Sequence, residues 1–190
     1  MRIVVSGTHA SGKSTLVADL VARLPGHMAL PDPFELVEVD EPASARSFVE
    51  QLAVSAERLV ELRPGSEVVA ERGPVDFLAY LEALRELGRR SVDPDSLALL
   101  RATAAEAMAH ADLLVVLPLD PDDDIWVPED EDRDLRDAMD RHLLDLCADE
   151  EVLGRSVVVL EVSGPPARRV ADVLGAVAAR GAPRHPSSGS

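Results

Sequence analysis

The residues with the clearest chemistry in this sequence lie near its N-terminus. Gly7, Gly12, Lys13 and Ser14 fit the pattern G-x-x-x-x-G-K-S, and a helical pattern follows directly. Glycines let the backbone wrap closely around phosphate oxygens, and a helix start adds partial positive charge. Lys13 would reach the β- and γ-phosphates, and the Ser14 hydroxyl would bind Mg²⁺. The predicted nucleotide-binding residues are Gly7, Thr8, His9, Ala10, Ser11, Gly12, Lys13, Ser14 and Thr15.

A second set of polar residues follows two other short apolar runs. Asp32 comes after Met28–Leu30, and Glu71 and Arg72 come after Val68–Ala70. Ligands of open α/β sheets bind beyond the carboxyl ends of the strands, so these side chains should meet near the glycine loop. A carboxylate can orient or deprotonate an acceptor hydroxyl, and a cation can stabilise a moving phosphoryl group. The sequence therefore predicts a site of phosphoryl transfer.

Short apolar runs without alternation indicate the elements that position these residues, because such runs are typical of strands buried on both faces of a parallel sheet. The predicted strands are Ile3–Val5, Val68–Ala70, Leu113–Leu117, Val157–Leu160 and, more weakly, Met28–Leu30. Apolar stripes at helical spacing predict helices over Ser14–Leu24, Ala43–Leu62, Val75–Leu87, Asp95–His110, Arg133–Cys147 and Arg168–Ala179. The alternation predicts an α/β fold with a five-stranded, mainly parallel sheet.

Length and composition exclude several classes of protein. The 190 residues fit one domain over 1–180, with a flexible tail over 181–190. The net charge of −16 disfavours nucleic acid as a partner, and no apolar run is long enough to span a membrane. A single cysteine, Cys147, and no pattern of a signal peptide favour a cytoplasmic protein.

Residues that the sequence lacks narrow the class of nucleotide-binding protein. It contains no asparagine and its only lysine is Lys13, so it has no Asn-Lys-x-Asp motif for reading guanine. The spacing D-x-x-G of a GTPase switch occurs only at Asp172–Gly175, inside a predicted helix. A small kinase that phosphorylates a small molecule remains.

Three motifs together resemble a known family. They are GTHASGKST at residues 7–15, Asp32-Pro33, and ERGPVDFLAY at residues 71–80. In these motifs the chain resembles P-loop small-molecule kinases, namely the AAA-type ATP-binding proteins related to the ribosylnicotinamide kinase domain. More distantly it is similar to deoxynucleoside and thymidylate kinases. The resemblance implies a three-layer P-loop NTPase fold with ATP and Mg²⁺ as cofactors.

The resemblance also implies roles for individual residues. Asp32 looks like the general base for the acceptor hydroxyl, with Glu35 as the alternative. Glu71 looks like an acid near Mg²⁺ or the acceptor, and Arg72 like a contact to phosphate or to the base. A structural ion pair at the sheet edge is the alternative for Glu71 and Arg72, and Asp76 is expected to act as a local cap or pair.

The family has a lid that brings arginines over the phosphates, and here the lid corresponds to residues 120–141. Its catalytic candidates are Arg133 and Arg136, with Arg141 as a further candidate, although pairing with nearby acids would explain them equally. The segment from Asp120 to Asp134 holds nine acids in 15 positions, which departs from the family pattern. Beyond the last predicted strand, Ser163–Pro166 resembles the loop that wraps adenine.

The acceptor is less defined by the sequence. Tyr80 and Trp126 are predicted to line its pocket, Phe77 is predicted to lie in the core, and His9 is a spacer or a substrate contact. Acidic residues crowd the predicted entrance and would favour a cationic or amine-bearing acceptor. These entrance residues are Asp32, Glu35, Glu38, Asp40 and Glu41.

Three functions are compatible with the sequence. The first is an ATP-dependent kinase that acts on a nucleoside-like or amine-bearing small molecule. The second is an ATP-binding switch or accessory module that acts through a protein partner. The third is a P-loop enzyme of another reaction class, such as a ligase or a sulfo-group transferase. The sequence does not fix the oligomeric state; a homodimer is compatible with it, and Ala43–Leu62 and Asp95–His110 could supply the interface.

Overall fold

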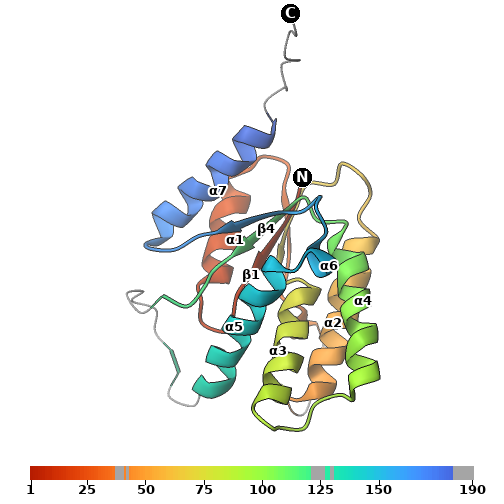
Figure 1. Cartoon of the computed structure of the whole chain (residues 1–190). Coiled ribbons are helices and arrows are strands. Elements are labelled where there is room, and N and C mark those ends of the chain that lie inside the picture. Colours follow the sequence, from red (N-terminus) through yellow and green to blue (C-terminus); the bar gives the residue numbers. More distant parts are fainter. Residues whose placement is uncertain (37–40, 42, 121–126, 129–130, 182–190) are drawn as a thin grey trace, which may run out of the picture.

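The computed structural model describes residues 1–36, 41, 43–120, 127–128 and 131–181, which form one five-stranded sheet between two layers of helices (Figure 1). All strand pairs are parallel. In spatial order the strands are β2 (Met28–Leu30), β3 (Val68–Glu71), β1 (Arg2–Ser6), β4 (Leu113–Val116) and β5 (Val158–Glu161). The predicted α/β fold class is confirmed.

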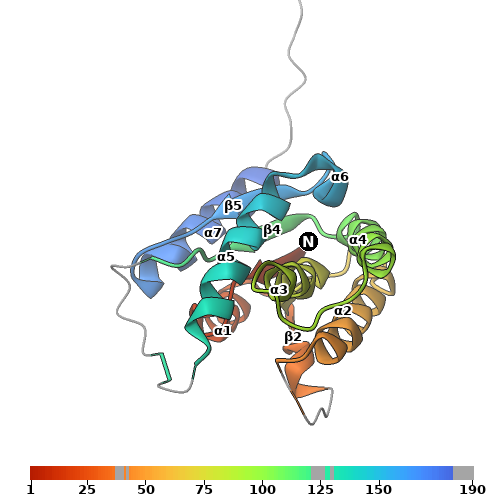
Figure 2. The same cartoon turned by 60° about the horizontal axis from the view of Figure 1, so that its bottom comes forward.

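The helices form two layers, one against each face of the sheet (Figure 1 and Figure 2). One layer contains α1 (Lys13–Arg23) and α7 (Pro166–Gly181). The other contains α2 (Ala45–Val60), α3 (Pro74–Glu86), α4 (Pro94–Met108), α5 (Arg133–Ala148) and α6 (Glu150–Leu153). Because side chains alternate along a strand, Ile3 and Val5 of β1 pack toward the α1 layer while Val4 packs toward α3. Each face of the sheet therefore has its own apolar core.

The sequence expectation fails in two details. Runs such as Val157–Leu160 were expected to be buried on both faces, but β5 is only partly buried and Val158 is exposed. The reason is its place at the edge of the sheet, and β2 at the opposite edge is similarly exposed. Two short helices, η1 (Pro33–Glu35) and α6, were not predicted because they are too short to show a periodic pattern.

Some predictions fall outside the described residues. These are the pocket role of Trp126, the entrance acids Glu38 and Asp40, most of the acidic part of the lid, and residues 182–190 of the tail. Among the helices that the structure describes, none is long and apolar enough to cross a membrane.

Candidate functional site

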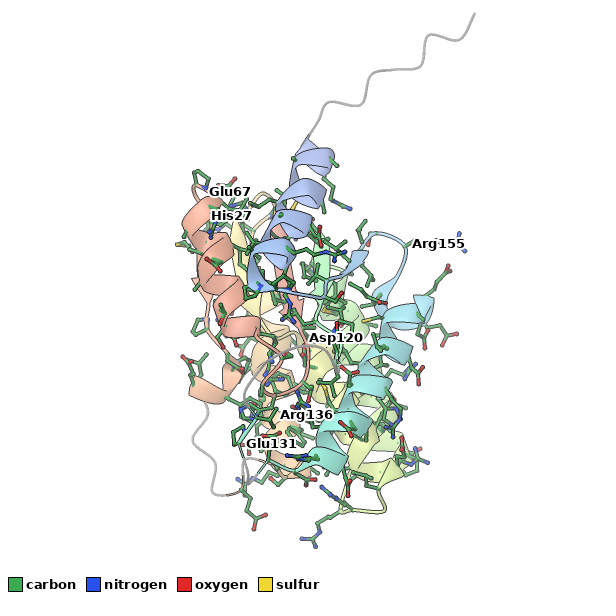
Figure 3. All side chains as sticks on the ribbon, turned by 90° about the vertical axis from the view of Figure 1, so that its left-hand side faces the viewer. His27, Glu67, Asp120, Glu131, Arg136 and Arg155 are labelled. Carbon is green, nitrogen blue, oxygen red and sulfur yellow. The ribbon has the colours of Figure 1, made fainter. Side chains whose placement is uncertain are left out.

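A cleft of about 700 Å³ lies at the carboxyl edge of the sheet. Its described lining comes from the loop after β1, from η1, from the end of β3, from α2 and α3, and from residues near the start of α5. Figure 3 shows Glu131 and Arg136 at one end of the molecule and His27 and Glu67, which directly precede β2 and β3, at the opposite end. The cleft is therefore at the end of the sheet where the strand-edge rule predicted it.

The glycine loop between β1 and α1 has the backbone conformation that wrapping an anion requires. Gly12 has φ +89°, and even Ala10 has φ +51°, which is a left-handed conformation that only glycine adopts easily. Gly7, with φ +153°, cannot be replaced, since a Cβ there would lie 2.9 Å from the Leu117 carbonyl oxygen. The turn delivers the first residues of α1 into the cleft with their N–H groups free of helix partners.

Lys13 begins α1 and is only 4% exposed. Its Nζ donates to the Thr8 carbonyl oxygen at 2.6 Å and more weakly to Ser11 Oγ at 3.4 Å. Burial, together with repulsion from Arg72, lowers the pKa of Lys13 from 10.5 to about 7. The loop therefore holds an ammonium group that a bound phosphate would stabilise in its charged form.

Every carbonyl group of the loop from Gly7 to Ser11 accepts a hydrogen bond from a cationic side chain. The contacts are Arg72 Nη1 to Gly7 (3.1 Å), Lys13 Nζ to Thr8 (2.6 Å), Arg136 Nε to His9 (3.0 Å), Arg136 Nη2 to Ala10 (3.3 Å) and Arg169 Nη1 to Ser11 (2.8 Å). In a trans peptide the C=O of one residue points opposite to the N–H of the next. Holding each carbonyl in place therefore fixes the orientation of the N–H group of the following residue.

Ser14 and Glu71 provide a pair of oxygen atoms that fits a magnesium ion. Ser14 Oγ donates to Glu71 Oε1 at 2.6 Å, and both residues line the cleft. Two neighbouring ligands of an octahedral Mg²⁺ lie about 3 Å apart, given its short metal–oxygen distances. The described residues contain no group of three or more His, Cys, Asp or Glu side chains arranged to hold a metal. Mg²⁺ takes most of its ligands from phosphate and water, so a pair of protein oxygen atoms is enough to place it.

Asp32 and Arg72 form a nearly buried ion pair beside the loop. Arg72 Nε donates to Asp32 Oδ2 at 2.8 Å, and the second oxygen of Asp32 accepts from the Phe34 N–H at 3.0 Å. Although burial opposes the charge of Arg72, the neighbouring Tyr80, Asp32 and Asp76 raise its pKa. The ion pair therefore holds Asp32 as a fixed carboxylate that lines the cleft.

Asp76 is more deeply involved than a local cap. It is fully buried, and its carboxylate accepts hydrogen bonds from Ser6 Oγ (2.5 Å), Gly7 N (3.0 Å) and Gly73 N (2.9 Å). Burial raises its pKa, while Arg72 at 3.8 Å and these donors oppose the rise. Its position in the first turn of α3 suggested only a cap or a local pair, because Gly7 and Ser6 are 69 and 70 residues away in the sequence.

Aromatic side chains form the floor of the cleft on the side of Asp32. Phe48 and Tyr80 stack with ring centroids 4.5 Å apart, and Phe34 meets Phe48 edge-on at 6.4 Å. Tyr80 lines the cleft as predicted, but its hydroxyl is used internally, since it accepts from the His9 N–H at 3.2 Å. Phe77 is fully buried in the core, as predicted.

The lid residues that the structure describes belong largely to α5. Residues 133–141 form its first half, which packs on α3 through buried Leu135 and Met139. Arg136 reaches the glycine loop, whereas Arg133 is exposed and Arg141 pairs with Glu86 on α3. Figure 3 places Glu131 beside this end of α5, where it contacts His9 of the loop. Glu35 is exposed and lines the cleft.

Arg169 is a residue of this site that sequence reasoning missed. An arginine in the first turn of an amphipathic helix is ordinarily solvent-exposed, yet Arg169 is 4% exposed and holds the Ser11 carbonyl oxygen. The only signal in the sequence was its place in α7 directly after the loop Ser163–Pro166.

Comparison with known proteins gives one family and several similar structures. The family model described as AAA domain matches residues 2–169. Deoxyadenosine kinase from M. mycoides with bound dATP is 12% identical with a TM-score of 0.66, and the match covers 94% of this chain and 100% of that one. Thymidylate kinase from Candida albicans is 16% identical with a TM-score of 0.62, over 94% of this chain and 91% of that one. At such identities the likeness concerns the fold. No curated protein sequence matches the chain.

Proposed function

The chain belongs to the AAA domain family, and from this premise we propose that it is an ATP-dependent kinase that transfers the γ-phosphoryl group to a hydroxyl of a small molecule. Nucleotide binding follows from the P-loop domain, and the transfer is our inference. The observation that carries it is the presence in one cleft of the Lys13 loop, the Ser14–Glu71 oxygen pair and the fixed Asp32 carboxylate. The fold of nucleotide kinases is consistent with this proposal.

In the proposed reaction each residue of the cleft has one task. The loop N–H groups and Lys13 bind the β- and γ-phosphates, and Ser14 with Glu71 would hold Mg²⁺, which neutralises charge on those phosphates. Asp32 accepts the proton of the acceptor hydroxyl, whose oxygen forms a new bond to the γ-phosphorus as the bond to the β–γ bridging oxygen breaks. Arg72 holds Asp32 in a fixed orientation through the 2.8 Å contact.

The acceptor is proposed to be nucleoside-like or amine-bearing. The aromatic floor of Phe34, Phe48 and Tyr80 suits a flat group, and the described entrance keeps Glu35 exposed to attract a positive charge. The switch or accessory module stays as the second candidate, because slow hydrolysis needs the same phosphate loop and no acceptor.

The proposal is tested by measuring ADP release from Mg·ATP with a panel of nucleosides, ribosylnicotinamide, amino sugars and amino alcohols. One acceptor class should raise ADP release well above the rate without acceptor, and its product should gain one phosphate. Lys13→Ala should abolish the release, because Lys13 is the only lysine of the sequence and no other lysine could replace it at the phosphates. ADP release that no acceptor increases would reject the kinase and favour the switch.

A further inference from the structure

Arg169 connects two loops that come together only in the folded chain. Its Nη1 donates to the Ser11 carbonyl oxygen at 2.8 Å, and its Nε donates to the Gly164 carbonyl oxygen at 2.7 Å. Ser11 belongs to the phosphate loop after β1, and Gly164 belongs to the turn between β5 and α7. The guanidinium therefore spans the ends of two strands that are not neighbours in the sheet.

Arg169 does not belong to the described residues of the cleft that would touch a nucleotide. It is 4% exposed, and it is not among the described residues that line the cleft. Ser11 and Gly12, in contrast, both line the cleft. Arg169 therefore reaches the nucleotide site through the backbone of Ser11, which it holds.

The geometry of the peptide bond gives this effect a direction. The Ser11 carbonyl and the Gly12 N–H share one peptide plane and point to opposite sides of the chain. Because Arg169 holds the Ser11 carbonyl in place, the Gly12 N–H is held pointing away from Arg169. Gly12 is the N-cap residue of α1 and has φ +89°. Because it has no side chain, no side-chain hydrogen bond caps the helix there. The orientation of this peptide consequently depends on its hydrogen-bond partner.

We infer that Arg169 is a positioning residue for nucleotide binding, which holds the Ser11–Gly12 peptide in its anion-binding orientation and ties it to the turn after β5. The inference rests on nucleotide binding at the loop and not on the proposed kinase reaction. Arginine suits this role better than lysine, because its planar fork presents donors in two fixed directions at once. Gly164, with φ +81°, turns its carbonyl toward the same fork.

The test compares Arg169→Lys with Arg180→Lys in the full chain. Both substitutions keep the charge and lie in α7, but Arg180 is an exposed residue in the last turn. Two quantities are measured for each variant, namely the dissociation constant of Mg·ATP without any acceptor and the hydrogen exchange of the ligand-free backbone. Arg169→Gln serves as a second variant if the lysine variant lacks a cooperative unfolding transition, since glutamine retains a donor at the site.

Arg169→Lys should weaken Mg·ATP binding by about tenfold, the effect of losing one charge-assisted hydrogen bond, and Arg180→Lys should leave it unchanged. Exchange should accelerate over residues 7–12 and 162–166 while α3 stays as protected as in the wild type. A wild-type affinity and exchange pattern would overturn the inference. Acceleration spread evenly over the molecule would also overturn it, because that result indicates general destabilisation. Neither outcome depends on whether any acceptor is phosphorylated.

Discussion

Asp32, the N-cap of η1, and Glu35, within η1, were both candidates for the general base, and the structure gives the two carboxylates different surroundings. Asp32 is fixed by the Arg72 guanidinium and by the Phe34 N–H, whereas Glu35 is exposed at the cleft. A base must hold a set orientation toward the hydroxyl that it deprotonates. The geometry therefore favours Asp32 for the proton and leaves Glu35 for attraction of the acceptor.

We expect Asp32→Asn to lower kcat by about 10²–10⁴, the usual contribution of a general base. Its dissociation constant for Mg·ATP should stay close to the wild-type value, since asparagine can still accept from the Phe34 N–H. Glu35→Gln is the matched control and should keep kcat while raising KM for a cationic acceptor. Steady-state kinetics with the acceptor found in the ADP-release panel provides the measurement. A large fall in kcat for Glu35→Gln with little effect of Asp32→Asn would show that Glu35, and not Asp32, is the general base.

The buried ammonium of Lys13 makes nucleotide binding sensitive to pH. Because the pKa of Lys13 is about 7, the group is charged below that pH and largely neutral above it in the free protein. Bound phosphates raise this pKa again, so at pH 8 binding of Mg·ATP should take up a proton. The affinity should accordingly fall as the pH rises above about 7, with a limit of tenfold per pH unit for one proton.

Proton uptake is measured by titration calorimetry at pH 8 in two buffers with different ionisation enthalpies. Lys13→Arg is the control, because a guanidinium stays charged throughout this range and should remove the uptake. Equal heats in the two buffers for the wild type would contradict the lowered pKa.

At the scale of elements, α3 is the helix that fixes the site. It packs against α2, α4 and α5, and its first turn supplies Asp76 to the phosphate loop. Tyr80, one turn later, holds the His9 N–H through its hydroxyl. The close approach of α3 to the sheet depends on Gly73 at its start, where a Cβ would lie 2.8 Å from Val4 Cγ1 and 3.3 Å from Met108 Sδ.

We expect Gly73→Ala to lower the free energy of unfolding by about 1–3 kcal/mol, because an added methyl group must displace a packed core. It should also weaken Mg·ATP binding, since the shift moves Asp76 away from Gly7. Gly175→Ala is the matched comparison, since a Cβ there meets no described atom within 4 Å in the middle of α7. That variant should gain about 0.5–1 kcal/mol from helix propensity. Urea unfolding measures both changes, and equal effects of the two substitutions would disprove the packing argument.

At the scale of the whole molecule, the charge of −16 sets the field around the cleft. The described cleft residues include Asp32, Glu35, Glu71, Glu131 and Asp132, against His9, Lys13 and Arg72. Both Lys13 and Arg72 are buried and already hydrogen-bonded to the loop. An approaching acceptor therefore meets a negative entrance.

A cationic acceptor should consequently have a higher kcat/KM than a neutral analogue of the same shape. The ratio should shrink as the salt concentration rises from about 0.02 to 0.3 M, because screening shortens the reach of the field. Kinetics of such a pair at both salt concentrations measures the effect. A ratio near one, or a ratio that salt leaves unchanged, would show that the acidic residues do not select the acceptor.

The oligomeric state, for which α2 and α4 could supply an interface, is measured by light scattering.

The sequence alone determined the phosphate loop, because the eight residues from Gly7 to Ser14 are contiguous and their function lies in their own backbone. It also determined the convergence of Asp32, Glu71 and Arg72 at one edge, since parallel strands bring their carboxyl ends together. Apolar runs located all the strands of the described sheet, with ends that differ by about one residue.

Only the tertiary structure decided which side chain holds which partner. Asp76 holds Gly7, Arg136 holds the His9 and Ala10 carbonyls, and Arg169 joins Ser11 to Gly164. These partners come from separate elements, and a hydrogen bond depends on shifts well below the rise of one helical residue. Periodicity gives the face on which a residue lies, but not the position of one element against another. The sequence therefore marked Arg72 and Arg136 as candidates for phosphate contacts, and only the fold shows that they and Arg169 hold carbonyl groups of the phosphate loop.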